Sequence, residues 1–328
     1  MANPLQNLLQ KLPLNSLPLR AGQFLSGLAQ DFWHDGPENP FRRGAGTQSE
    51  FHTELRAEPR TAQQPAAAKP AAASLWHALA GEISEKMWGD GFVTPASDAV
   101  TDMLIKPLGL NKQMSVLDLS AGLGGRMRRI TKDFGVYVTG LEPDPGIAAR
   151  GMEMSARLGK GKQDAISHYT PATFSAGKTV TQSYDCIIAC ETFYRVQDKQ
   201  KFFAALTACT KPQAQVSYTD YIVNPENRKN AAIVAWQNYE KDTTPLGLIE
   251  TAEGWAKEGF KLRVNDDQTD FYRKEVVAGL QRLATFLGTM SRPDLETRNA
   301  ILRRMEIWAH RLAAMEQGMK FYRFYGTR

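Results

Sequence analysis

The sequence is poor in cysteine, in long apolar runs and in charge of one sign. Its three cysteines form no C-x-x-C pair, which argues against a disulfide framework and a cysteine-based metal site. No apolar run approaches the roughly 20 residues of a membrane span, and no secretory signal pattern is present. Basic residues (40) outnumber acidic ones (35) too slightly to indicate a nucleic-acid partner. We therefore expect a globular protein of the reducing cytoplasm.

The first 74 residues differ from the rest of the chain. Residues 1–30 contain no acid, and their leucine pattern is broken by Pro13 and Pro18. This pattern fits an amphipathic anchor or a transit peptide, and equally a tail that docks on a partner or a membrane surface. Residues 31–74 lack periodicity and end in an alanine-proline run. We expect residues 1–74 to be a long, largely disordered arm and linker that the fold does not need.

Strands and helices alternate in the central part of the chain. Apolar runs predict strands at 115–119, 136–141, 165–169, 184–190 and 214–219, and periodicity predicts helices at 123–133, 144–158 and 197–210. This spacing is typical of parallel βαβ units, so we predict an α/β fold with a doubly wound, Rossmann-like sheet.

Helices dominate on both sides of this core. The pattern predicts helices at 75–88 and 96–106 before it, and at 226–241, 249–255, 271–287 and 294–317 after it. Short strands are expected at 260–264 and 319–325. We predict one domain over residues 75–328, with lid helices at 75–110, a core at 111–221, and a lid insert and C-terminal part at 222–328.

The segment Val116–Gly125 combines a buried strand, an acid and a glycine-rich turn. Glycines at 122 and 124 let the backbone approach a nucleoside, because a Cβ there would occupy the ligand's space. Glu142, at the end of the next strand, can accept both hydroxyls of a ribose. Nicotinamide enzymes require a third glycine, and Met127 stands there. Asp118 before the loop instead favours S-adenosylmethionine, because its carboxylate can bind the methionyl ammonium of that cofactor. The alternative is that the loop is a tight turn between strand and helix that binds no ligand.

Five segments resemble one known family. Over residues 82–328 the chain resembles the class I S-adenosylmethionine-dependent methyltransferases, and especially the phosphoethanolamine and glycine/sarcosine/dimethylglycine N-methyltransferase group. The resemblance is carried by Met87–Phe92, Leu117–Gly125, Tyr184–Glu191, Thr219–Tyr221 and Trp308–Thr327. It implies S-adenosyl-L-methionine as cofactor, held by Asp118, Ser120, Gly122, Gly124 and Glu142, and a small-molecule substrate.

The chain also departs from this family. Ser120 replaces the first loop glycine, which is tolerable where its φ is negative. Ser84 and Arg195 replace the catalytic tyrosine and histidine of the phosphobase enzymes, and their phosphate-binding cluster has no clear counterpart. Tyr221 and Arg311 carry over. We therefore expect no turnover of phosphoethanolamine.

Methyl transfer is an in-line displacement that needs positioning in a dry site and no metal. Glu191, at the exit of the fourth strand, can steady an ammonium. Arg195, from the same loop, suits a carboxylate or phosphate on the substrate, or pairs with Glu191. We predict catalytic roles for Glu191, Arg195 and Tyr221, and substrate contacts for Phe92, Tyr194 and Arg311. These residues favour an amine acceptor that carries an anionic group.

Two other classes of function stay open. The replaced catalytic pair, Ser84 and Arg195, favours a degenerate cofactor-binding domain that acts as a scaffold or regulator through its N-terminal arm. The basic pI of about 9.0 favours a methyltransferase of RNA or protein. The segment Ala189–Tyr194 lacks the N/D-P-P-Y-like motif that such enzymes require.

Overall fold

The computed structural model describes residues 72–95, 98–180, 182–289 and 294–328, without the side chains of 72–78 and 80. The first 71 residues of the predicted arm lie outside this part of the chain. Residues 72–74, which we assigned to the linker, instead open helix α3 (Ala72–Trp88).

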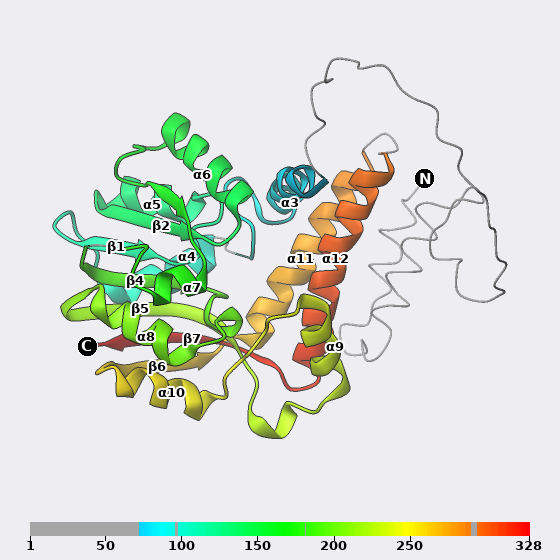
Figure 1. Ribbon diagram of the computed structural model, residues 1–328. Coiled ribbons are helices and arrows are strands. Elements are labelled where there is room, and N and C mark those ends of the chain that lie inside the picture. The colour runs from blue at the N-terminus through cyan, green and yellow to red at the C-terminus, as the bar shows by residue number, and fades with distance from the viewer. Residues whose placement is uncertain (1–71, 96–97, 181, 290–293) are drawn as a thin grey trace, which may run out of the picture.

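Seven strands form one sheet in the order β3-β2-β1-β4-β5-β7-β6 (Figure 1). The first five are parallel, and β7 runs antiparallel to both β5 and β6. The prediction of a doubly wound sheet with a returning last strand is confirmed. The strands are β1 (Ser115–Asp118), β2 (Tyr137–Glu142), β3 (Ile166–His168), β4 (Tyr184–Cys190), β5 (Thr210–Ile222), β6 (Lys261–Asp267) and β7 (Lys320–Thr327).

The helices follow the predicted order, with one addition. A short helix, α7, follows β3, where we had predicted none. A capping box between Thr170 and Thr173 starts it, and Pro171 stands in its first turn. The other helices after α3 are α4 (Asp98–Ile105), α5 (Gly125–Phe134), α6 (Pro145–Leu158), α7 (Pro171–Ser175), α8 (Lys199–Ala208), α9 (Ala231–Glu240), α10 (Leu248–Lys257), α11 (Thr269–Leu287) and α12 (Leu295–Glu316).

Strand β4 lies at the centre of two hydrophobic cores. Ile187 and Ala189 pack into one core, with side chains of α8 and α10. Cys186 and Ile188 pack into the other, with side chains of α4 and α5. A strand covered on both faces is apolar throughout, which is why residues 184–190 show no alternation of apolar and polar residues.

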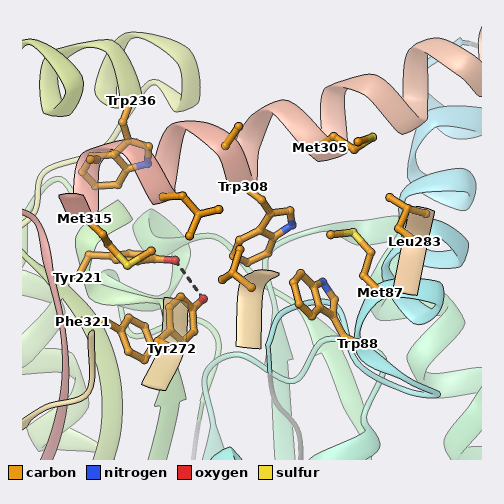
Figure 2. Packing of buried hydrophobic residues seen from close by; sticks show 14 of the residues in the cluster. Met87, Trp88, Tyr221, Trp236, Tyr272, Leu283, Met305, Trp308, Met315 and Phe321 are labelled. Carbon is orange, nitrogen blue, oxygen red and sulfur yellow. Dashed lines mark hydrogen bonds between the residues drawn. The ribbon is translucent and has the colours of Figure 1, made fainter. Parts of the chain in front are cut away.

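Helices α3, α9, α11 and α12 form a third core beside the sheet (Figure 1). Trp88 of α3 meets Trp308 of α12 edge to face, with ring centroids 4.8 Å apart. Figure 2 shows these indoles between Met87 and Met305 on one side and the Tyr221–Tyr272 pair on the other. Trp88 and Trp236 are buried in this helical core.

Gly279 of α11 makes room for the Trp88 ring. A Cβ at this position would overlap with that ring. We expect Gly279→Ala to lower the free energy of unfolding by about 1–3 kcal/mol through overpacking. Gly81→Ala in α3 is the matched control, since its Cβ would meet Arg150 at an ordinary 3.7 Å. The control should gain up to about 1 kcal/mol of helix propensity in urea denaturation; an equal gain for Gly279→Ala would contradict the packing.

Candidate active site

A cavity of about 480 Å³ opens at the carboxyl ends of β1, β2 and β4. Its lining comes from the loops after these strands, from Val93 and Thr94 after α3, and from one stripe of α12. The charged side chains that line it are Glu142, Asp144, Glu191, Arg195, Arg304 and Arg311. Carboxylates and guanidiniums from distant parts of the chain thus line the same cavity.

Glu142 lies at one side of the cavity and is 7% exposed. Its Oε2 accepts from the Gly122 amide at 2.9 Å and its Oε1 from the Asp144 amide at 3.0 Å. Burial raises the pKa of Glu142 to about 7, against the lowering effect of these two amides. Each carboxylate oxygen keeps a free lone pair for a further donor.

Gly122 has a positive φ of 55°, and a Cβ there would lie 2.9 Å from the Val93 side chain. A Cβ on Gly124 would meet Arg128 and Ile166. Neither glycine lines the cavity. We had argued that a side chain at these positions would fill the ligand's space; in this structure such a side chain would first meet Val93, Arg128 or Ile166.

Asp118 is fully buried and forms an ion pair with Arg126 of α5. Arg126 donates its Nε to Oδ2 and its Nη2 to Oδ1 of Asp118, both at 2.9 Å. A third donor, Nη1 of Arg126, reaches the Cys190 sulfur. Both oxygens of the acid that we expected to face a ligand ammonium are therefore engaged by a guanidinium.

Ser120 bridges the loop and strand β4. Its hydroxyl accepts from the Cys190 amide at 2.7 Å and donates to Asp118. Ser120 is not one of the described residues that have a positive φ. Its backbone therefore meets the condition of a negative φ that we set for a residue in place of the loop glycine. The serine ties the loop after β1 to the start of the loop after β4.

Glu191 leaves β4 with a φ of 52°, a left-handed conformation that costs a non-glycine residue free energy. The turn directs its carboxylate toward two tyrosine hydroxyls, of Tyr221 at 3.2 Å and of Tyr272. Nη1 of Arg311 forms an ion pair with the same carboxylate at 2.5 Å. Both oxygens of Glu191 are thus occupied by neighbours within the chain.

Arg311 joins Glu191 to a second acid, Glu240 of α9. Its Nε lies 2.5 Å from Glu240 Oε1, and its Nη2 bonds the hydroxyl of Tyr194 at 2.7 Å. Burial would lower the pKa of Arg311, but Glu240 and the other partners hold it well above its usual range. We call these residues the buried network: Glu191, Tyr194, Tyr221, Glu240, Tyr272 and Arg311.

Arg195 pairs with Glu240 and lies at the edge of the network. Its Nη2 is 2.7 Å from Glu240 Oε2, and about half of its side chain (48%) is exposed. The pairing with Glu191 that we had considered is not formed, since Arg311 holds that acid. Burial alone would raise the pKa of Glu240, but Arg311 and Arg195 lower it to about 2.

The structure brings most of the predicted residues together. Glu191, Tyr194, Arg195 and Arg311 line the cavity, whereas Tyr221 lies behind Glu191 and lines a smaller pocket. Phe92, predicted as an aromatic wall, packs against the helical core and over Gly125.

Four residues at the site were missed or given no role: Arg126, Glu240, Tyr272 and Arg304. Glu240 acts through Arg311, 71 residues away in the sequence, which no local pattern indicates. Arg126 pairs with Asp118, only eight residues before it, and was given no role because Asp118 was expected to face the ligand. Arg304 carried a signal, because it lies one heptad before Arg311 and therefore on the same stripe of α12.

In the part of the chain that the structure describes, no helix combines the length and the apolar character needed to span a membrane. The described residues also hold no cluster of three or more metal-ligating side chains.

The fold and the site define a class of protein. A mixed sheet of this order, with a glycine turn after β1 and an acid after β2, is the class I methyltransferase fold. A family model described as a methyltransferase domain matches residues 92–250. In its motifs, in this family match and in its fold, the chain is therefore similar to the class I S-adenosylmethionine-dependent methyltransferases.

The similar proteins include N-methyltransferases of small amines. Phosphoethanolamine N-methyltransferase of Triticum aestivum is 25% identical over 198 residues, which cover 58% of this chain and 36% of the relative. The structure of Haemonchus contortus phosphoethanolamine N-methyltransferase 2 with phosphomonomethylethanolamine and S-adenosylhomocysteine has a TM-score of 0.63 at 17% identity, covering 75% of this chain and 56% of that one.

A putative sarcosine dimethylglycine methyltransferase from Galdieria sulphuraria also has a TM-score of 0.63, at 18% identity. This match covers 76% of the present chain and 97% of the other. With the first curated relatives, by contrast, the shared region spans only 36–43% of their length. At these identities the solved structures establish the fold of the chain.

Proposed function

We propose that the chain binds S-adenosylmethionine in this cavity and methylates a small amine that carries an anionic group. The observation that carries the proposal is that one cavity contains both Glu142, after β2, and Glu191, after β4. Bound S-adenosylmethionine would supply an activated methyl group. Relatives named for phosphoethanolamine and for glycine, sarcosine and dimethylglycine support an acceptor of this class.

The residues present fit the adenosine part of this cofactor. The free lone pairs of Glu142 suit the two ribose hydroxyls, and Ile147, Tyr169 and Pro171 offer apolar surface beside them. Tyr169 is fixed there, because its hydroxyl donates to the Leu119 carbonyl at 3.0 Å. Asp118 fits the methionyl ammonium less well, since Arg126 engages both of its oxygens.

On the acceptor side the chain provides a rigid, charged wall. Trp308 lines the cavity and carries the Arg311 guanidinium 4.5 Å from its ring centroid. Glu191 faces the cavity while Tyr221 and Tyr272 hold its orientation. A carboxylate fixed in this way can orient an ammonium group without reorganising, which is how positioning accelerates a displacement.

A second function has a specific observation in its favour. Arg126 pairs with Asp118 and Arg311 pairs with Glu191, so the two acids predicted to meet an ammonium group are already paired. That pairing favours a cofactor-binding domain that acts as a scaffold or regulator. The two functions differ in one measurement: a scaffold binds the cofactor and methylates no amine.

Binding of the cofactor should depend on the ionisation of Glu142. The pKa of this acid is raised to about 7, and only its ionised form can accept from both ribose hydroxyls. Affinity for S-adenosylhomocysteine should therefore rise about tenfold between roughly pH 6 and pH 8. Glu142→Gln should weaken binding by about tenfold or more at the higher pH and remove this dependence.

Isothermal titration calorimetry at both pH values checks this result. Glu153→Gln, on the exposed surface of α6, is the control that should keep the affinity of the unmodified chain. Absence of S-adenosylmethionine binding by the unmodified chain would overturn the proposed function. Binding by Glu142→Gln at full strength would move the ribose site elsewhere.

A further inference from the structure

Arg304 is the third arginine that lines the cavity, beside Arg195 and Arg311. It lies on the stripe of α12 that also carries Trp308 and Arg311, two helical turns before the latter. Seven residues of helix correspond to about 10 Å along the axis. The guanidinium therefore reaches the cavity from the side of Val93 and Thr94, apart from the buried network.

Unlike the other two arginines, Arg304 has no acidic partner among the described residues. Within the described ranges its guanidinium donates from Nη2 to the Val93 carbonyl at 2.6 Å. Its Nε is buried and has no acceptor in that part of the chain. Buried donors without acceptors are rare in folded proteins, so the state of this side chain needs an explanation.

The charges around Arg304 leave one cation unbalanced. The nearby carboxylates are engaged by the other two guanidiniums: Glu191 pairs with Arg311, and Glu240 pairs with Arg311 and Arg195. Burial lowers the pKa of Arg304 to about 10, which still leaves it cationic at neutral pH. An uncompensated charge in a shielded site is costly, and a bound anion would offset that cost.

We propose that Arg304 binds the anionic group of the methyl acceptor, a carboxylate or a phosphate, on the α12 side of the cavity. The inference rests on the proposed function and replaces Arg195 in that role. Arg195 is already paired with Glu240 and half exposed. A guanidinium with free donors can bind an oxyanion through two parallel hydrogen bonds, which also orients the acceptor.

Arg304 also has a structural contact, and the variants must separate the two roles. Arg304→Gln removes the charge and keeps an amide that can donate to Val93. Arg303→Gln is the matched control, because Arg303 is the preceding residue, is exposed and does not line the cavity.

The first experiment is calorimetric titration of inorganic phosphate into the full chain saturated with S-adenosylhomocysteine. Phosphate should bind the unmodified chain and Arg303→Gln equally, and Arg304→Gln roughly tenfold or more weakly. Equal phosphate binding by all three proteins, or no phosphate binding by the unmodified chain, would overturn the inference. Loss of S-adenosylhomocysteine binding by all three would instead overturn the proposed function.

The second experiment compares charged and uncharged acceptors. Sarcosine is tested against sarcosinamide, an amine of similar size that lacks the carboxylate. In Arg304→Gln the KM of the charged acceptor should rise roughly tenfold or more, with kcat and the KM of its uncharged counterpart nearly unchanged. An equal rise for both members of a pair would assign Arg304 to the structure of the Val93 loop.

Discussion

Replacing Arg311 with methionine should lower the free energy of unfolding by about 3–5 kcal/mol, because it leaves buried carboxylates without their cation. Arg311 is 3% exposed and bonds Glu191, Glu240, Tyr194 and Tyr221. Methionine matches much of the apolar stem and removes every one of these donors. Glu240 keeps Arg195, whereas Glu191 keeps only tyrosine hydroxyls.

The loss should depend on pH. Arg311 helps to lower the pKa of Glu240 to about 2, so in the unmodified chain this acid contributes stability above its unfolded pKa of about 4.5. That contribution disappears as the pH falls through the folded pKa. The difference between the unmodified chain and Arg311→Met should therefore be largest at neutral pH and shrink below about pH 4.5.

Urea denaturation at neutral and acidic pH measures both effects. The double variant Arg311→Met with Glu240→Gln should recover part of the lost stability, since the two residues are directly coupled. Arg303→Met, on the exposed face of α12, should change stability by less than about 0.5 kcal/mol. A deficit independent of pH would show that Arg311 acts through packing alone.

The alternation of strands with helices and the glycine-rich loop after β1 were predictable, because they follow local patterns. The apolar run at 184–190 and the acids at its end and at the end of β2 lie within single elements. Alternation of strands with helices then fixed which loops meet at the carboxyl edge of the sheet. Glu142 and Glu191 were placed at the cavity for this reason.

The partners of these acids were not predictable. Glu191 and Arg311 are 120 residues apart, and Glu240 joins them from the helix between β5 and β6. Several arginines of α12 were available to any of these acids. Which arginine pairs with Glu191 and Glu240 depends on how α12 packs against α9 and α3. That packing follows from the shapes of Trp88, Trp236 and Trp308 rather than from a motif.

The pair of Asp118 and Arg126 supports the second large expected effect. Arg126→Met should lower the free energy of unfolding by about 3–5 kcal/mol, because Asp118 would stay fully buried with only Ser120 as a partner. Asp118→Asn together with Arg126→Met should recover a large part of the loss, since the buried charge is then gone. Thermal unfolding of the three variants measures this cycle.

The same variant tests whether Asp118 can contact the amino-acid part of the cofactor. In the unmodified chain Arg126 holds both oxygens of Asp118, so S-adenosylmethionine should gain little there over adenosine, which lacks the ammonium. In Arg126→Met those oxygens are free to accept from an ammonium. For each protein we compare the rise in melting temperature caused by S-adenosylmethionine with the rise caused by adenosine. The difference between the two rises should be larger for the variant than for the unmodified chain. Equal shifts in the two proteins would make Asp118 a residue that only shapes the loop, with the ammonium bound elsewhere.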